Sequence, residues 1–257
     1  NDYVSELVFP TLAEIQTPWG AEEPFVRPSA PFSYTNGWGA AMAVLTPIAI
    51  GTAIGHRTAR AMWVLVIALV AAIPPAIATT NRGLFLGIAG AVVYVLFCLL
   101  IRGRLLALFW VTTLSAAGAL VLFLSGFLDG INERQETVDT TEGRGSLYAE
   151  TWERTLQSPV IGWGAPRPST WSEIYVGTQG AIWNAMFCFG LVGLFLFLGM
   201  IVMGAVRTFD APNLSAVWIH ASIVVTVFLS IFYGLDRQLV FVGIALAVLL
   251  REKYLGN

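Results

Sequence analysis

The chain has 257 residues, of which 56% are hydrophobic and 12% are charged, and its mean hydropathy is +0.73. Soluble domains carry about 25% charged residues, so this composition excludes an ordinary water-soluble protein and predicts an all-α, polytopic transmembrane helix bundle. The net charge of −2 and the lack of a basic stripe give no reason to expect nucleic acid as a partner.

Seven apolar runs are candidates for membrane-spanning helices, because a hydrocarbon core about 30 Å thick needs ~20 apolar residues in helical form. In chain order they are residues 39–55, 61–78, 84–101, 105–128, 181–206, 214–233 and 238–250. Pro74 and Pro75 lie late in the second run and predict a kink or an early end there. Cys98 and Cys188 lie inside apolar runs and are interpreted as small buried hydrophobes, not as a disulfide or a zinc site.

The distribution of charged residues predicts which ends of these runs face the cytoplasm. The loops after the odd-numbered runs are basic and contain Arg57, Arg102 and Arg207, whereas acidic residues gather in the other segments. Positively charged loops stay in the cytoplasm, so the long polar segments are predicted to be extracytoplasmic. The expected organisation is an extracytoplasmic segment 1–38, four transmembrane helices in 39–128, an extracytoplasmic loop 129–180, and two or three transmembrane helices with a cytoplasmic tail in 181–257. The polar, Pro-rich start at Asn1 leads us to expect further transmembrane helices upstream.

The loop 129–180 is longer than a connector needs to be, and long loops usually carry function. Residues 145–156 within it predict a short helix with an apolar stripe that recurs every four residues. The stripe consists of Tyr148, Trp152 and Leu156. Such a helix would lie against the membrane surface or cap the bundle. Ser158 is expected to end it, and residues 162–168 predict a tight, irregular loop.

The basic residues on the predicted outer side are all arginines. A guanidinium is a planar fork of donors that matches phosphate and carboxylate oxygens and does not lose its proton. Arg82, before the third run, and Arg237, before the seventh, would lie near the outer headgroups, where the anionic group of a lipid-linked substrate would sit. The alternative is interfacial snorkelling or pairing with a neighbour such as Asp236. His220, in the sixth run, is interpreted as a hydrogen-bonded structural histidine.

Several short motifs follow one another along almost the whole chain. They are PFSYTNGWG at 31–39, TNRG at 80–83, EGR at 142–144 with LY at 147–148, SPVIGWG at 158–164, GAPRP at 164–168, and GTQG at 177–180 followed by GLVG at 190–193. In this order and topology they resemble the O-antigen ligase and O-antigen polymerase family of membrane glycosyltransferases. The GAPRP motif is similar to that of actinobacterial members in particular.

The resemblance implies a metal-independent, inverting glycosyltransferase of cell-envelope polysaccharide biosynthesis, without a cofactor, on the outer face of the cytoplasmic membrane. Its donor would be a glycan on polyprenyl pyrophosphate, its acceptor a glycan, a lipid or a protein, and its surroundings membrane lipids. By position, the resemblance implies that Arg82 and Arg144 bind the donor phosphates, and Arg167 follows the subgroup pattern. Arg237 is added because of its place before the seventh run.

One position departs from the family pattern. Family ligases have a histidine, credited with acting on the acceptor hydroxyl, where this chain has Gln179. An amide does not titrate usefully and cannot act as a general base. Either another group serves, with Glu142, Glu150 and Glu173 nearby, or stabilisation of the leaving group by arginines suffices, or the chain is inactive. The catalytic candidates are accordingly Arg144, Gln179, Glu150 and Glu173.

Two other functions stay open. A transporter or flippase for a lipid-linked or anionic substrate would place charge or broken helices near the membrane midplane, whereas the centres of the predicted helices are nearly bare of charge. A non-catalytic membrane subunit is favoured by Gln179. The acids Glu133, Glu136 and Asp139 are interpreted as a solvated face and not as a site for a hard cation, so no metal is expected.

Overall fold

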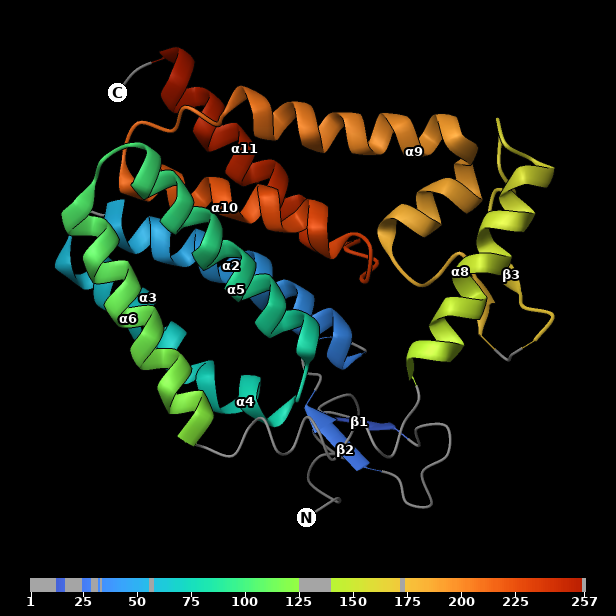
Figure 1. The fold of residues 1–257 in the computed structure, drawn as a ribbon, viewed down its shortest axis with the longest axis horizontal. Coiled ribbons are helices and arrows are strands. Elements are labelled where there is room, and N and C mark those ends of the chain that lie inside the picture. Colours follow the sequence, from blue (N-terminus) through green and yellow to red (C-terminus); the bar gives the residue numbers. More distant parts are fainter. Residues whose placement is uncertain are drawn as a thin grey trace.

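The structure is a computed structural model that describes residues 13–16, 25–28, 32, 34–55, 58–124, 140–171 and 174–255. It is predominantly helical (Figure 1), as predicted. Two small antiparallel sheets accompany the helices in the described residues. One pairs β1 (Ala13–Gln16) with β2 (Phe25–Pro28), and the other pairs β3 (Arg167–Pro168) with β4 (Tyr175–Val176).

The helices that the structure describes follow the predicted runs closely. They are α2 (Thr35–Gly55), α3 (Ala59–Ala71), α4 (Ile73–Ala78), α5 (Arg82–Ile101), α6 (Leu105–Leu124), α8 (Thr140–Gln157), α9 (Ala181–Arg207), α10 (Leu214–Leu229) and α11 (Gln238–Leu255). Among these, five segments are long and apolar enough to cross a membrane: α2, α3 together with α4, α5, α6 and α9. The apolar helix α10 has only 16 residues, and α11 carries three charges in its last turns. Helices of this length and apolarity are typical of a membrane protein.

Several helix boundaries differ from the expected runs, and α2, for example, begins at Thr35, four residues before the predicted start at residue 39. The second run is divided at Ala72, and α4 starts with Pro74 in its first turn, which agrees with the kink predicted there. The sixth run ends as a helix at Leu229 and not at residue 233, because residues 230–237 turn the chain into α11. The seventh run continues to Leu255, one turn past its apolar part.

The core is centred on α10, which packs against α2, α5, α9 and α11. Its His220 is buried, with Nε2 2.8 Å from the carbonyl oxygen of Ala205 and Nδ1 2.6 Å from the hydroxyl of Tyr94. A carbonyl only accepts, so Nε2 carries the proton and Nδ1 accepts from the tyrosine. The prediction of a hydrogen-bonded structural histidine is therefore confirmed.

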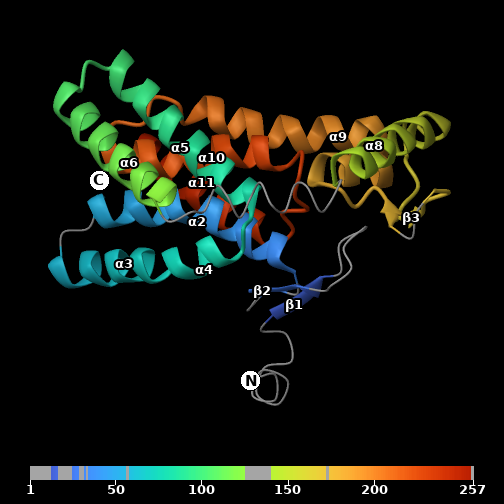
Figure 2. The ribbon, with the colours of Figure 1, turned by 60° about the horizontal axis from the view of Figure 1, so that its bottom comes forward.

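The periphery is apolar as well. Neither α3 nor α6 buries a side chain completely, and both expose large apolar residues such as Ile67 and Leu106. Figure 2 shows α3 side by side with α2 along one edge of the bundle, and the two helices are in contact. Such faces are costly in water and favourable in hydrocarbon.

One end of the bundle brings together two loops and the end of α11, which the charge pattern assigned to a common side. Arg102, between α5 and α6, donates hydrogen bonds to the carbonyls of Phe209 and Ala211, between α9 and α10. Lys253, late in α11, pairs with Asp210 of the same loop at 3.0 Å. The two loops and the end of α11 therefore lie together.

The helix α8 lies outside the bundle with the β3–β4 sheet, and it packs on the first part of α9 (Figure 1). It ends at Gln157, directly before Ser158, as expected, but it begins at Thr140, five residues before the predicted start at residue 145. The predicted irregular loop has positive φ angles at Gly162 and Gly164 before it enters β3.

Candidate functional site

Four helices begin at the end of the bundle opposite to the basic loops, and the turn from α10 to α11 holds their N-termini together. The Tyr233 carbonyl accepts from the amide of Ala181, the first residue of α9, at 2.8 Å. The Tyr233 hydroxyl donates to Asn81, directly before α5. Gln238, the first residue of α11, donates from Nε2 to the carbonyl of Gly37 in α2 at 2.9 Å.

Asn81 is the polar centre of this arrangement. It is buried, and its Oδ1 caps α5 by accepting from the amide of Leu84 at 3.2 Å. Its Nδ2 donates to the carbonyl of Thr35, the first residue of α2, at 3.3 Å. A single side chain thus fixes the starts of α2 and α5 and the turn that follows α10.

A cavity of about 400 Å³ opens at this end, within the size range of small-molecule sites. Its walls combine aromatic rings, amides, hydroxyls, one acidic side chain and one basic side chain. They are formed by Phe32, Tyr34, Asn36, Gly37, Ala40, Thr178, Phe232, Tyr233, Gly234, Leu235, Asp236, Arg237 and Gln238. The N-terminal turns of α2 and α11 contribute to the lining, and helix N-termini carry partial positive charge. The cavity therefore suits a molecule with an apolar part and an anionic part.

The two arginines near helix starts differ in their relation to this cavity. Arg237 is exposed and lines it, beside Asp236. Arg82 is half-buried and begins α5 next to Asn81, at the same end of the bundle but outside the lining. The structure therefore brings both residues to one end of the bundle, as expected from their positions before the third and seventh runs.

Gln179 lies one residue from the cavity wall at Thr178. It is half-buried, and its Nε2 donates to the carbonyl of Tyr175 at 2.9 Å and to the Thr178 hydroxyl at 3.3 Å. Its Oε1 is 3.5 Å from the hydroxyl of Thr151 in α8, which is a long contact. Gln179 thus joins the edge of the cavity to α8.

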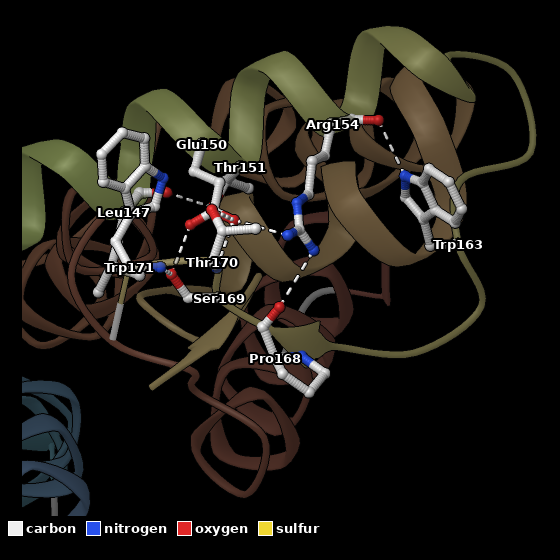
Figure 3. Close-up of polar contacts among 9 residues, drawn as sticks. All are labelled: Leu147, Glu150, Thr151, Arg154, Trp163, Pro168, Ser169, Thr170 and Trp171. Atoms are coloured by element: carbon white, nitrogen blue, oxygen red, sulfur yellow. Dashed lines mark hydrogen bonds and ion pairs between the residues drawn. The ribbon is translucent and has the colours of Figure 1, made fainter. Parts of the chain in front are cut away.

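Glu150 lies on α8 with both carboxylate oxygens engaged (Figure 3). Oε2 accepts from the Ser169 hydroxyl at 2.5 Å, and Oε1 accepts from the amide and the hydroxyl of Thr170, each at 3.0 Å. The guanidinium of Arg154 is 2.8 Å from Oε1. Burial alone raises the pKa of Glu150, but the hydrogen bonds from Ser169 and Thr170 and the charge of Arg154 outweigh it, so the pKa lies below its usual value. An acid of lowered pKa with occupied oxygens is better suited to anchoring residues 167–171 than to accepting a proton.

Arg167 belongs to the same region as Glu150 and not to the cavity. It is exposed at the start of β3, and its guanidinium carbon lies 4.4 Å from the centre of the Trp163 ring. The Trp163 indole donates in turn to the carbonyl of Arg154 at 2.8 Å, while Arg154 donates to the carbonyl of Pro168 at 3.1 Å (Figure 3). Arg167 is therefore held on the outer surface beside α8.

The side chain of Arg144 and the whole of Glu173 lie outside what the structure describes. Arg144 is in the helical first turns of α8, but its side chain and that of Glu142 are not described, and Glu173 is not described at all. Their relation to the cavity stays a prediction.

A break in α9 was not foreseen from the sequence. Gly190 has φ 70° and ψ −173°, which breaks the helix. Backbone groups on either side of the break lose their helical hydrogen-bond partners and bind the turn after α8 instead. The carbonyls of Phe187 and Cys188 accept from the amides of Trp163 and Gly164 at 2.8 and 2.9 Å. The amide of Leu191 donates to the carbonyl of Pro159 at 2.7 Å. The sequence feature that could have indicated this break is the pair of glycines, Gly162 and Gly190, in two separate motifs.

Within the described part of the chain, no three histidine, cysteine, aspartate or glutamate side chains gather closely enough to hold a metal ion. Comparisons with protein-family models, with curated proteins and with solved structures found no match. The site is therefore defined by its geometry.

Proposed function

We propose that the chain is a multi-pass protein of the cytoplasmic membrane that transfers or polymerises a glycan linked to polyprenyl pyrophosphate, as an O-antigen-ligase-like enzyme. The observation that carries the proposal is the cavity at the end of the bundle where four helices begin, with Arg237 in its wall. Aromatic walls suit the sugar and the lipid, while helix N-termini and guanidinium groups suit the pyrophosphate.

In this proposal the chain crosses the membrane seven times, with α10 and α11 as the sixth and seventh spans. A span of 16 residues is short for lipid, but α10 is surrounded by protein along most of its length. The basic loops around Arg102 and Arg207 face the cytoplasm. The cavity then opens on the extracytoplasmic side, where a lipid-linked donor presents its sugar.

The chemistry is an inverting transfer. The acceptor hydroxyl oxygen forms a bond to the anomeric carbon, the bond from that carbon to the pyrophosphate oxygen breaks, and the hydroxyl proton passes to a base. Arginines stabilise the charge that develops on the leaving pyrophosphate. Arg237 acts in the cavity wall, with Arg82 and Arg144 as further phosphate ligands, whereas Arg167 is left out of this set because it stacks on Trp163 beside α8, away from the cavity.

The mechanism also needs a general base that accepts the proton of the acceptor hydroxyl. Gln179 does not titrate, and Glu150 is already paired with Arg154. Asp236 is exposed in the cavity wall next to Arg237, so it is the carboxylate that an acceptor in the cavity would meet. Gln179 would then orient the acceptor by hydrogen bonds.

The test compares three arginine-to-lysine variants in nanodiscs, with a short-chain polyprenyl-pyrophosphate glycan as the donor and a radiolabelled product as the readout. Arg237→Lys and Arg144→Lys should each lower kcat/KM about a hundredfold, because an ammonium lacks the guanidinium fork. Arg60→Lys, an exposed position on α3 at the other end of the bundle, is the matched control and should keep the wild-type rate. Equal activity in all three variants would remove the arginines from the mechanism.

The same preparation separates the two rival functions. A transporter would use the break in α9 at Gly190, but the carbonyls released there already bind the chain's own Trp163 and Gly164. Donor translocation between leaflets without product would support a transporter, and donor binding without product or translocation would support a non-catalytic subunit.

A further inference from the structure

Four large apolar side chains form a continuous exposed strip along α8 and the turn that follows it. Trp152 and Leu156, one helical turn apart, are 48% and 52% exposed, and Val160 and Ile161 are 64% and 79% exposed. Exposed apolar strips of this kind mark a surface that binds something other than water.

The strip occupies one of three faces of α8. Leu147, Thr151 and Thr155 form the face buried in the protein. On one flank, Glu150 and Arg154 bind residues 167–171. The strip runs along the other flank, so α8 separates a polar, hydrogen-bonded side from an apolar, uncovered side.

The turn that ends the strip is bound to α9, which is long and apolar enough to cross a membrane. The carbonyl of Pro159 accepts from the amide of Leu191, which begins the second segment of α9, and a Cβ on Gly162 would lie 2.5 Å from the Gly190 amide nitrogen. That second segment exposes Val192 and Phe195 in its first turns, at 51% and 75%. Figure 1 shows α8 at a steep angle to this long segment of α9, and not parallel to it as a further span would be.

We propose that this strip is a membrane seat: it inserts into the outer interface of the same bilayer that α9 crosses, so that α8 lies along the membrane surface. The occupant is lipid, because the turn that ends the strip is hydrogen-bonded to the start of the second segment of α9, whose exposed side chains are apolar as well. The polar flank with Glu150 then faces the aqueous side. Seating α8 in this way holds Gln179, which contacts Thr151, at a constant height beside the cavity.

This inference rests on the transmembrane placement of α9, which is part of the proposed function, and it is independent of glycan transfer. A depth measurement therefore tests it. Single spin labels are attached at Ile161→Cys, Phe195→Cys and Trp171→Cys, in a chain whose buried Cys98 and Cys188 are replaced by alanine. Positions 161, 195 and 171 are similarly exposed at 79%, 75% and 77%, so differences in collision rate report the surroundings and not burial.

In nanodiscs that hold one protein each, the label at 161 should collide with oxygen several-fold more than with a water-soluble nickel reagent, as the label at 195 does. The label at 171 should show the reverse. A nickel-accessible label at 161 beside a lipid-buried label at 195 would overturn the seat and leave the proposed function intact. Nickel access at both 161 and 195 would overturn the transmembrane placement itself. A label at 161 that is accessible in single-copy discs but broadened by a neighbouring spin in dense vesicles would assign the strip to a second copy of the chain.

Discussion

The hydroxyl of Tyr233 donates a hydrogen bond to Oδ1 of Asn81, 152 residues earlier in the chain, and joins the turn after α10 to the start of α5. The same oxygen caps α5 by accepting from the backbone amide of Leu84, and the side-chain nitrogen Nδ2 of Asn81 donates to the carbonyl of Thr35 at the start of α2. The cavity wall that carries Arg237 is part of the same turn as Tyr233. The stability of this network and the shape of the cavity are therefore linked.

Asn81→Ala should destabilise the protein by about 2–4 kcal/mol. It removes a helix cap, worth about 1 kcal/mol, and leaves the buried partners at Tyr233 and Thr35 without this side chain, at about 1–3 kcal/mol. Tyr233→Phe should cost only about 1 kcal/mol, because Asn81 keeps its cap. The free energy of unfolding is measured in mixed micelles by titration with SDS. Asn213→Ala, which removes the exposed cap of α10, serves as the control and should cost about 1 kcal/mol. Equal losses for Asn81 and Asn213 would contradict a central role for Asn81.

Gly83→Ala should disrupt the same network by steric contact. A Cβ at Gly83 would lie 2.0 Å from the hydroxyl oxygen of Tyr233, so the ring would have to move and give up its bond to Asn81. We expect a loss of about 1–3 kcal/mol in the free energy of unfolding. Gly90 lies in the same helix with open space around it, so Gly90→Ala should be neutral or stabilising by up to about 1 kcal/mol. A Gly83→Ala protein as stable as Gly90→Ala would show that Tyr233 does not lie against α5.

Gly190→Ala should detach the turn after α8 from α9. The backbone at Gly190, with φ 70° and ψ −173°, is essentially restricted to glycine, and a Cβ there would lie 2.5 Å from the carbonyl oxygen of Val160. Amide hydrogen exchange of residues 158–164 in nanodiscs should accelerate at least tenfold. Gly199→Ala, in the same helix but without neighbours within 4 Å, should leave that exchange unchanged. Slow exchange in both variants would indicate a continuous α9.

The docking of residues 167–171 on α8 should weaken in acid. Because the pKa of Glu150 is lowered in the folded state, its contribution is fully present above the ordinary glutamate pKa of about 4.3 and is lost as the pH falls through the lower folded-state value. Exchange of the Thr170 amide, which donates to Glu150, should lose protection in that window. Glu150→Gln should abolish this pH dependence, whereas Glu153→Gln, at an exposed position three residues along α8, should retain it. Identical profiles for the two variants would exclude Glu150 as the titrating group.

Local chemistry was sufficient to predict the helices. Runs of apolar side chains near membrane length, ended by arginines, glycines and prolines, predicted most helix starts correctly, and Pro74 and Pro75 predicted the division between α3 and α4. The same reasoning found α8 and its end at Ser158. It worked because hydrophobicity and backbone restrictions act over a few neighbouring residues.

Partners distant in the sequence required the tertiary structure. From the sequence, Glu150 was one of several candidate bases, and only the fold showed that it holds Ser169, Thr170 and Arg154. Gly190 lies in an apolar run that favours a continuous helix, and the break exists because the turn containing Gly162 binds the backbone groups it releases. Composition alone thus determined that the chain forms long apolar helices suited to a bilayer, because that depends on each segment's own side chains. The tertiary structure decided which helix starts share a cavity with Arg237, because a hydrogen bond across 152 residues leaves no periodic trace in either segment.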